Sequence, residues 1–221
     1  FLGSGAVIHA LEGEQDMRRM GGLKKKLPWT YWTFLISTIA IAGFPPFAGF
    51  WSKDEILAQA WPIETGNRVV FWALAVAAGL TAFYTARQLC LTFAGEPRTE
   101  AAKHAPESVP SMTWPLIILA VFAVCIGWVG IPENLPGLGG IIPNWFHHFV
   151  GSTIEAGGGH GTEHAARGAG QLLLSVGGEV HSNLPLYMGM AMGVGGLALG
   201  WLVYGWRPLK AGEMDRVEAG M

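Results

Sequence analysis

Three stretches of the sequence are long, apolar and almost free of charge. Residues 69–93 contain a single charged side chain, Arg87, and residues 112–131 and 184–206 contain none. A helix needs roughly 20 predominantly apolar residues to cross the hydrocarbon core of a bilayer, and each stretch is long enough. Only 14% of the residues are charged, against about 25% in soluble domains. The sequence therefore predicts an all-α, polytopic transmembrane helical bundle.

A fourth apolar stretch, residues 29–61, is interrupted by the run GFPPFAG at residues 43–49. Pro45 and Pro46 carry no backbone N–H donor, and the flanking glycines adopt conformations closed to other residues, so we expect two half-helices. In hydrocarbon, the backbone groups freed at such a break are tolerated only against protein or a water-lined cavity. The stretch is predicted to be a discontinuous transmembrane helix, and its break indicates a transport path.

The remaining segments differ in their content of Lys and Arg, which cytoplasmic loops keep. Residues 1–11 are predicted to be the end of a truncated transmembrane helix, whose upstream part we expect to be missing. Residues 12–28 are predicted to be a basic loop, residues 132–183 a Gly/His-rich loop and residues 207–221 a tail. With helices alternating in direction, one side has only Arg68 and Arg167, and the other collects Arg18, Arg19, Lys24, Lys25, Lys26, Arg98, Lys103, Arg207, Lys210 and Arg216. We therefore expect the basic loop and the tail to be cytoplasmic and the Gly/His-rich loop to be periplasmic.

Three adjacent ionisable residues, Lys53, Asp54 and Glu55, follow directly after the break. A charge near the bilayer centre costs between about 3 and 10 kcal/mol or more, so it persists where it is paired, hydrated or functional. A lysine in a low-dielectric site gives up its proton readily, whereas a nearby carboxylate favours the charged form, so a moving partner makes lysine a proton switch. We expect Lys53 to be the proton relay and Asp54, with Glu55, an outlet or pairing group. The alternative is a solvated helix start with Ser52 as its cap and Glu55 as the capping partner.

Two further residues are candidates for the site. Arg87 stays protonated at any physiological pH, so it would hold an anion or a helix contact rather than relay a proton. Alternatively, its long side chain reaches the cytoplasmic interface. Tyr84, one turn earlier, is placed to hydrogen-bond in the same polar seam. His9 titrates near neutrality and is a candidate for proton entry, although a boundary histidine in a hydrated loop is the preferred interpretation.

Composition and motifs argue against several other classes. The formal net charge of -2 gives no basic field for nucleic acid. The glycines at residues 157–161 neither follow a strand nor open an apolar helix, so they are not a dinucleotide fingerprint. Cys90 and Cys125 are expected to be small buried apolar residues. Five histidines lie in the Gly/His-rich loop: His147, His148, His160, His164 and His181. No Cys or carboxylate set completes a metal-ligand pattern around them, so we predict no metal site.

Two motifs resemble a known family. The run HALEGEQDMRRMGGL at residues 9–23 is similar to a loop in the antiporter-like membrane subunits of respiratory NADH:quinone oxidoreductase (complex I) of the subunit L type. The run GFPPFAGFWSKDEIL at residues 43–57 resembles the proline-broken helix of that family, including its charged triplet. The resemblance extends from residue 1 to about residue 97 and is weak beyond residue 132.

The resemblance implies proton translocation. In the family, the lysine matching Lys53 lies on a central hydrophilic axis used for proton transfer, and the aspartate matching Asp54 is associated with the outlet. No cofactor is expected in this chain, because NADH, FMN, iron–sulfur clusters and quinone belong to partner subunits. The expected partners are other membrane subunits of complex I, the lipid bilayer and protons, with the chain crossing a bacterial inner membrane several times. The family's preceding relay lysine, N-terminal half and lateral helix are absent, so we do not expect the chain alone to pump.

Other classes of membrane protein remain as alternatives. The large subunit of a multisubunit sodium/proton antiporter shares the broken helix, as do membrane subunits of hydrogenase complexes more weakly. The pair Lys53-Asp54 and the Gly21-Gly22 loop favour complex I over both. A haem-binding redox protein needs histidines on facing helices, and the predicted complete spans contain none. A structural scaffold predicts that proton transport survives replacement of Lys53 by Ala.

Overall fold

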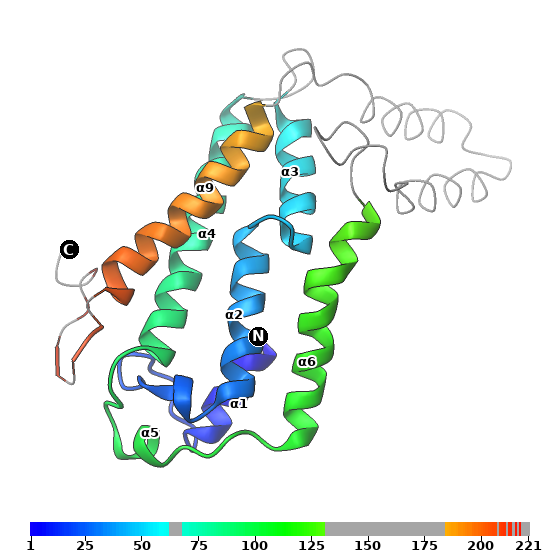
Figure 1. Ribbon diagram of the computed structural model, residues 1–221. Coiled ribbons are helices and arrows are strands. Elements are labelled where there is room, and N and C mark those ends of the chain that lie inside the picture. Colours follow the sequence, from blue (N-terminus) through cyan, green and yellow to red (C-terminus); the bar gives the residue numbers. More distant parts are fainter. Residues whose placement is uncertain are drawn as a thin grey trace, which may run out of the picture.

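The computed structural model describes residues 1–61, 68–130, 184–206, 208–210, 212–213, 215 and 217. Within these ranges the regular structure is helical and contains no strand, so the predicted all-α class is confirmed. Long helices lie side by side in a bundle, and short helices close one of its ends (Figure 1). The Gly/His-rich loop, with the five histidines considered above, lies outside the described residues.

The helices follow one another in the order in which the apolar stretches occur. They are α1 (Leu2–Ala10), η1 (Leu23–Lys25), α2 (Pro28–Ala42), α3 (Ala48–Ala60), α4 (Arg68–Phe93), α5 (Glu100–His104), α6 (Pro110–Cys125), η2 (Ile126–Gly130), α9 (Leu184–Gly200) and η3 (Trp201–Gly205), the last a π-helical turn.

Three helical segments are long and apolar enough to cross a membrane: Arg68–Phe93, Pro110–Trp128 and Leu184–Gly205. They cover the three charge-poor stretches of the sequence. Their outer faces carry large exposed apolar side chains, for example Leu80 on α4 and Ile118 on α6. Extended apolar surface is unusual on a soluble monomer and is what lipid requires of a spanning helix. The chain is therefore a membrane protein.

The fourth apolar stretch forms two helices instead of one. α2 has 15 residues and α3 has 13, so neither half reaches the roughly 20 residues of a full span. The two halves follow one another across the break (Figure 1), and together they form the discontinuous helix of the predicted fold.

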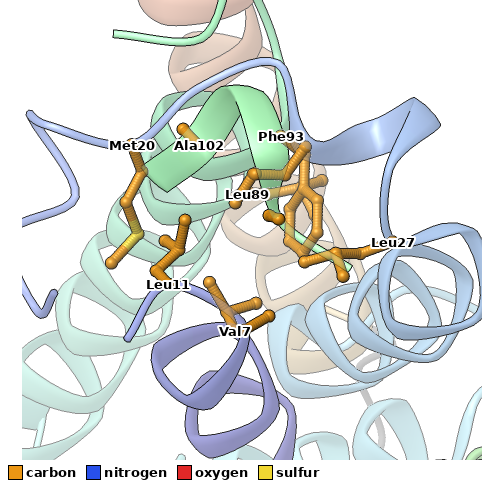
Figure 2. Packing of buried hydrophobic residues seen from close by; sticks show 10 residues of the cluster. Val7, Leu11, Met20, Leu27, Leu89, Phe93 and Ala102 are labelled. Carbon is orange, nitrogen blue, oxygen red and sulfur yellow. The ribbon is translucent and has the colours of Figure 1, made fainter. Parts of the chain in front are cut away.

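An apolar core closes one end of the bundle (Figure 2). Val7 and Leu11 lie at the end of α1, Met20 comes from the loop that follows, and Phe93 ends α4; all four are buried in one cluster together with Ala102 of α5. Burial of apolar side chains stabilises such a cluster by about 25 cal/mol per Å² of surface removed from water. The basic loop is therefore packed against the bundle, although its charged residues face outward.

The glycine pair of this loop lies against the chain that follows α4. Gly21 and Gly22 have φ angles of 127° and 65°, and the N–H of Gly22 donates to the Ala94 carbonyl at 3.1 Å. A Cβ atom on Gly21 would lie 2.6 Å from the backbone oxygen of Glu96. Only glycine meets both the backbone conformation and the space, so this part of the recognised motif serves packing at the bundle end.

Arg98 joins three segments at the same end. Its Nη1 donates to the carbonyl oxygens of Met17 and Leu91, each at 3.1 Å, and its Nε donates to that of Leu209 at 3.1 Å. The loop before α2, the end of α4 and the segment after α9 are thereby held together.

The two cysteines differ in their surroundings. Cys90 is buried as predicted, but Cys125 is exposed, so that prediction was wrong for the second residue. Every face of α6 is apolar, because the helix lies between protein and lipid, and the sequence pattern therefore does not distinguish its inward side from its outward side.

Candidate functional site

The helix break is a capped helix end followed by a short turn. At the end of α2, Gly43 has a φ of 79°, its N–H donates to the Ala40 carbonyl at 3.1 Å, and the Phe44 N–H donates to the Ile39 carbonyl at 3.2 Å. This pair of bonds is the Schellman arrangement, which needs a residue in the left-handed region and therefore favours glycine. The two prolines follow directly, and α3 begins at Ala48.

The two half-helices approach each other at Gly49, in the first turn of α3. A Cβ atom on Gly49 would lie only 1.9 Å from the Ala40 carbonyl oxygen and 2.9 Å from its carbon. The contact is backbone against backbone, so no side-chain movement would relieve it. Glycine is thus required at both ends of the break, for its conformation at Gly43 and for close approach at Gly49.

Lys53 bridges the break. Its Nζ donates to the carbonyl oxygen of Ile41 at 2.5 Å, one of the last four carbonyls of α2, which have no partner within their own helix. The C-terminal end of a helix carries partial negative charge, so an ammonium group is favoured there. The half-buried side chain passes Gly43, where a Cβ atom would lie 3.1 Å from the lysine Cδ.

A small cavity adjoins the lysine. Its lining comes from α3, α4, α9 and the break: Gly43, Phe50, Lys53, Asp54, Leu57, Ala78, Leu186 and Gly189. The ionisable members of this lining are Lys53 and Asp54. The two residues proposed to exchange a proton therefore border one space, although they are neighbours on a helix and point in different directions.

The alternative of a helix start at Ser52 is wrong. α3 begins at Ala48 with Phe47 as its cap residue, so Ser52 lies inside the helix. The neighbouring Trp51 is buried, and its Nε1 donates to the Pro46 carbonyl at 3.3 Å. Lys53, Asp54 and Glu55 consequently occupy the second turn of a helix that is anchored on the break by an aromatic side chain.

Arg87 is bound to a carboxylate, as predicted for one of its two interpretations. Its guanidinium forms an ion pair with Asp215, in which Nη2 contacts Oδ2 and Nε donates to the same oxygen at 3.1 Å. Its Nε also contacts the Tyr204 hydroxyl at 3.2 Å. The expected partner Tyr84 is exposed and lies outside this cluster, so that expectation was wrong. The hydroxyl in the seam comes from the end of α9.

Asp215 and Tyr204 were not found from the sequence. Asp215 is 0% exposed and Tyr204 1% exposed. Burial disfavours the charged carboxylate, but hydrogen bonds from Arg87, from Tyr204 and from the Val217 N–H hold the pKa of Asp215 below its ordinary value. The aspartate is separated from Arg87 by 128 positions, and it follows a polar tail, where nothing in the sequence distinguishes it from a hydrated carboxylate.

His9 lies in the last turn of α1 and is exposed. The acidic residues that follow it have basic partners: Asp16 pairs with Arg18 and Glu14 with Arg19, each at 3.0 Å. A hydrogen bond from Arg18 lowers the pKa of the Asp16 carboxyl. His9 is therefore distant in the chain from the break and stands at a hydrated boundary, and its role in proton entry stays a prediction.

The part of the chain that the structure describes contains no group of three or more His, Cys, Asp and Glu side chains that could hold a metal ion. Within these residues, the chemistry of the site rests on an amine, a carboxylate and the backbone of a broken helix.

A helical membrane segment with these features has relatives among known proteins. Residues 1–81 match the family described as NADH:quinone oxidoreductase/Mrp antiporter, TM. The match includes the break and Lys53 and ends within α4. This segment of the chain belongs to that family of transmembrane proteins.

Individual relatives narrow the resemblance. The chain is 46% identical over 159 residues to NADH-quinone oxidoreductase subunit L of Mycobacterium tuberculosis, which covers 71% of this chain and 24% of the relative. It is 45% identical over 184 residues to NAD(P)H-quinone oxidoreductase chain 5 of Picosynechococcus (71% and 26%). It is 40% identical over 169 residues to subunit L of Rhodobacter capsulatus (71% and 21%). The resemblance to the subunit L type is thereby confirmed, and the chain spans about a quarter of the length of these relatives.

Proposed function

We propose that the chain is part of a proton-translocating membrane subunit of an NADH:quinone oxidoreductase, in which Lys53 relays protons at the break of the discontinuous helix. The observation that carries this proposal is the 2.5 Å hydrogen bond from Lys53 to the Ile41 carbonyl, which joins the two halves of one helix beside a cavity. Relatives named as subunits of NADH-quinone and NAD(P)H-quinone oxidoreductases support this complex over a sodium/proton antiporter.

The proton changes how strongly Lys53 is held. The ammonium form is attracted by the Ile41 carbonyl and by the negative end of the α2 dipole, whereas the neutral amine keeps only a weaker hydrogen bond. Loss of the proton therefore releases the side chain from the break toward the cavity. Uptake of a proton returns it to the carbonyl, so position and protonation state change together.

Asp54 is the group proposed to take up the released proton. In that step an N–H bond of Lys53 breaks and an O–H bond forms on the Asp54 carboxylate, which leaves both residues uncharged in the low-dielectric interior. Water and Glu55 then carry the proton to the outlet. We assign proton entry to His9 only as a candidate, and we assign Arg87 to binding Asp215, since a guanidinium does not release its proton.

The electron chemistry is assigned to other subunits. NADH, FMN, iron–sulfur clusters and quinone are expected there, and this chain contributes the path for protons across the inner membrane of a bacterium. Its partners are the neighbouring membrane subunits and the lipid. The coupling between electron transfer and Lys53 then has to reach this chain through those subunits.

Replacement of Lys53 by Ala in the assembled complex tests the proposal. Quinone reduction and proton uptake are measured together in inverted membrane vesicles, and the number of protons per electron is expected to fall. Lys103→Ala is the matched control, because Lys103 is an exposed lysine that pairs with Glu100 at 2.7 Å. Pumping at the normal proton-to-electron ratio in Lys53→Ala would support the scaffold interpretation. Loss of sodium uptake instead of proton uptake would support antiport.

A further inference from the structure

Helix α9 lies directly against the end of α2. A Cβ atom added at Gly193 would lie 2.6 Å from the Ala42 carbonyl oxygen and 3.5 Å from that of Gly43. These residues end the half-helix whose Ile41 carbonyl binds Lys53. The backbone of α9 thus contacts the terminal turn of α2 without an intervening side chain, and Gly193 lies outside residues 1–81, the segment that matches the family.

The other glycines of α9 make different contacts. Gly196 and Gly200 face α4, where an added Cβ atom would lie 2.3 Å from the Gly79 carbonyl oxygen and 2.5 Å from Ala86 Cβ, respectively. An added Cβ atom on Gly195 would meet nothing within 4 Å. Gly193 is therefore distinguished by its partner, since it contacts the break while its neighbours contact a continuous helix or open space.

The same helix borders the cavity at Lys53. Leu186 and Gly189 of α9 belong to the cavity lining, and a Cβ atom on Gly189 would lie 3.0 Å from Leu57 Cδ1. α9 therefore touches the lysine site twice, once at the carbonyl end of α2 and once, about a turn earlier along the helix, beside the cavity. A displacement of α9 changes both the place of the acceptor carbonyls and the space around the ammonium.

We infer that Gly193 is a positioning residue for Lys53: by allowing α9 to lie on the last turn of α2, it fixes the Ile41 carbonyl opposite the ammonium and limits the cavity beside it. The consequence for proton transfer rests on the proposed function, whereas the positioning itself does not. A methyl group at this position must push either α9 or the end of α2 away, because backbone atoms on both sides meet it.

Chemical accessibility at position 53 tests the inference independently of pumping. The assembled complex carries Lys53→Cys, with Cys90→Ser and Cys125→Ser to remove the other thiols of this chain. The rate of labelling by a water-soluble methanethiosulfonate is then measured with and without Gly193→Ala. We expect the rate to change about fivefold or more, as an overpacked contact of this size implies. Gly195→Ala is expected to leave it unchanged.

Gly196→Ala is the matched control for general displacement of α9, because its clash is equally tight but involves α4. Equal labelling rates in Gly193→Ala and Gly196→Ala would overturn the inference, as would a rate in Gly193→Ala equal to that in Gly195→Ala. In the complex that retains Lys53, Gly193→Ala is expected to lower the proton-to-electron ratio more than Gly196→Ala does.

A milder variant covers the case in which Gly193→Ala does not assemble. In Gly189→Ala the added methyl group meets the flexible end of Leu57, so the helix is expected to tolerate it. It narrows the cavity and is expected to slow labelling at position 53; an unchanged rate would contradict the assignment of α9 to the site. Altered labelling together with normal pumping in Lys53→Ala would refute the proposed relay and leave the positioning role of α9 in place.

Discussion

The hydroxyl of Tyr204 donates to Oδ1 of Asp215 at 2.6 Å, while Arg87 holds the other carboxylate oxygen. The aspartate is fully buried, so both of its oxygens have donors inside the protein. The contact connects the segment after α9 to the middle of the bundle, and it gives Arg87 a defined anion.

Replacing Asp215 by Asn is expected to loosen the segment after α9. Removal of one partner from a buried ion pair costs about 3–5 kcal/mol, and the cost here is expected at or below the lower end because Arg87 is 23% exposed. The measurement is the rate of proteolysis within residues 208–217 in membranes. Asp16→Asn, which disrupts an exposed pair worth about 1 kcal/mol or less, should leave that rate unchanged. Equal rates in the two variants would contradict the anchoring role.

The anchor of Asp215 is expected to weaken in acid. Its pKa is lowered by its partners in the folded protein, so its contribution to stability is complete above the ordinary aspartate value of about 3.9 and is lost as the pH falls through the lower folded value. In Arg87→Gln the carboxylate loses its charged donor, so release should occur at a higher pH. A spin label at exposed Lys210→Cys measures tail mobility against pH. The same release pH in both proteins would exclude Arg87 as the cause of the shift.

Gly49→Ala is expected to separate the two half-helices. The new methyl group would lie 1.9 Å from the Ala40 carbonyl oxygen, and both sides are backbone, so the cost should reach about 3 kcal/mol, the upper part of the range for overpacking. The measurement is the amount of assembled subunit in the membrane. Gly5→Ala, whose added Cβ atom would meet nothing within 4 Å, is the control. Normal assembly of Gly49→Ala would show that the break tolerates wider spacing.

Glu107 is expected to stabilise the first turn of α2. Its carboxylate accepts hydrogen bonds from the Trp29 N–H at 2.9 Å and from the Thr30 hydroxyl at 2.8 Å, at the end of the helix where negative charge is favoured. Glu107→Ala should cost about 0.5–2 kcal/mol, seen as faster hydrogen exchange of the Trp29 amide. Unchanged exchange at this amide would mean that water replaces the carboxylate without cost.

The sequence allowed the break and its lysine to be predicted because both depend on local chemistry. Proline removes donors, glycine permits left-handed backbone, and a charge within an apolar stretch is costly, so the pattern at residues 43–57 is informative by itself. The anion for Arg87 was predicted as a class, but Asp215 was not identified, because a contact across 128 positions leaves no trace in spacing. Gly193 was equally hidden, since a glycine in an apolar helix shows its partner only in three dimensions.

Lys53→Arg in the assembled complex tests the central claim most directly. Arginine keeps the positive charge and can donate to the Ile41 carbonyl, but it does not release its proton. Proton uptake and quinone reduction are measured together in inverted vesicles, against the unmodified complex. The account predicts an assembled complex with a lowered number of protons per electron. An unchanged ratio in Lys53→Arg would show that the position needs a cation and not a proton relay.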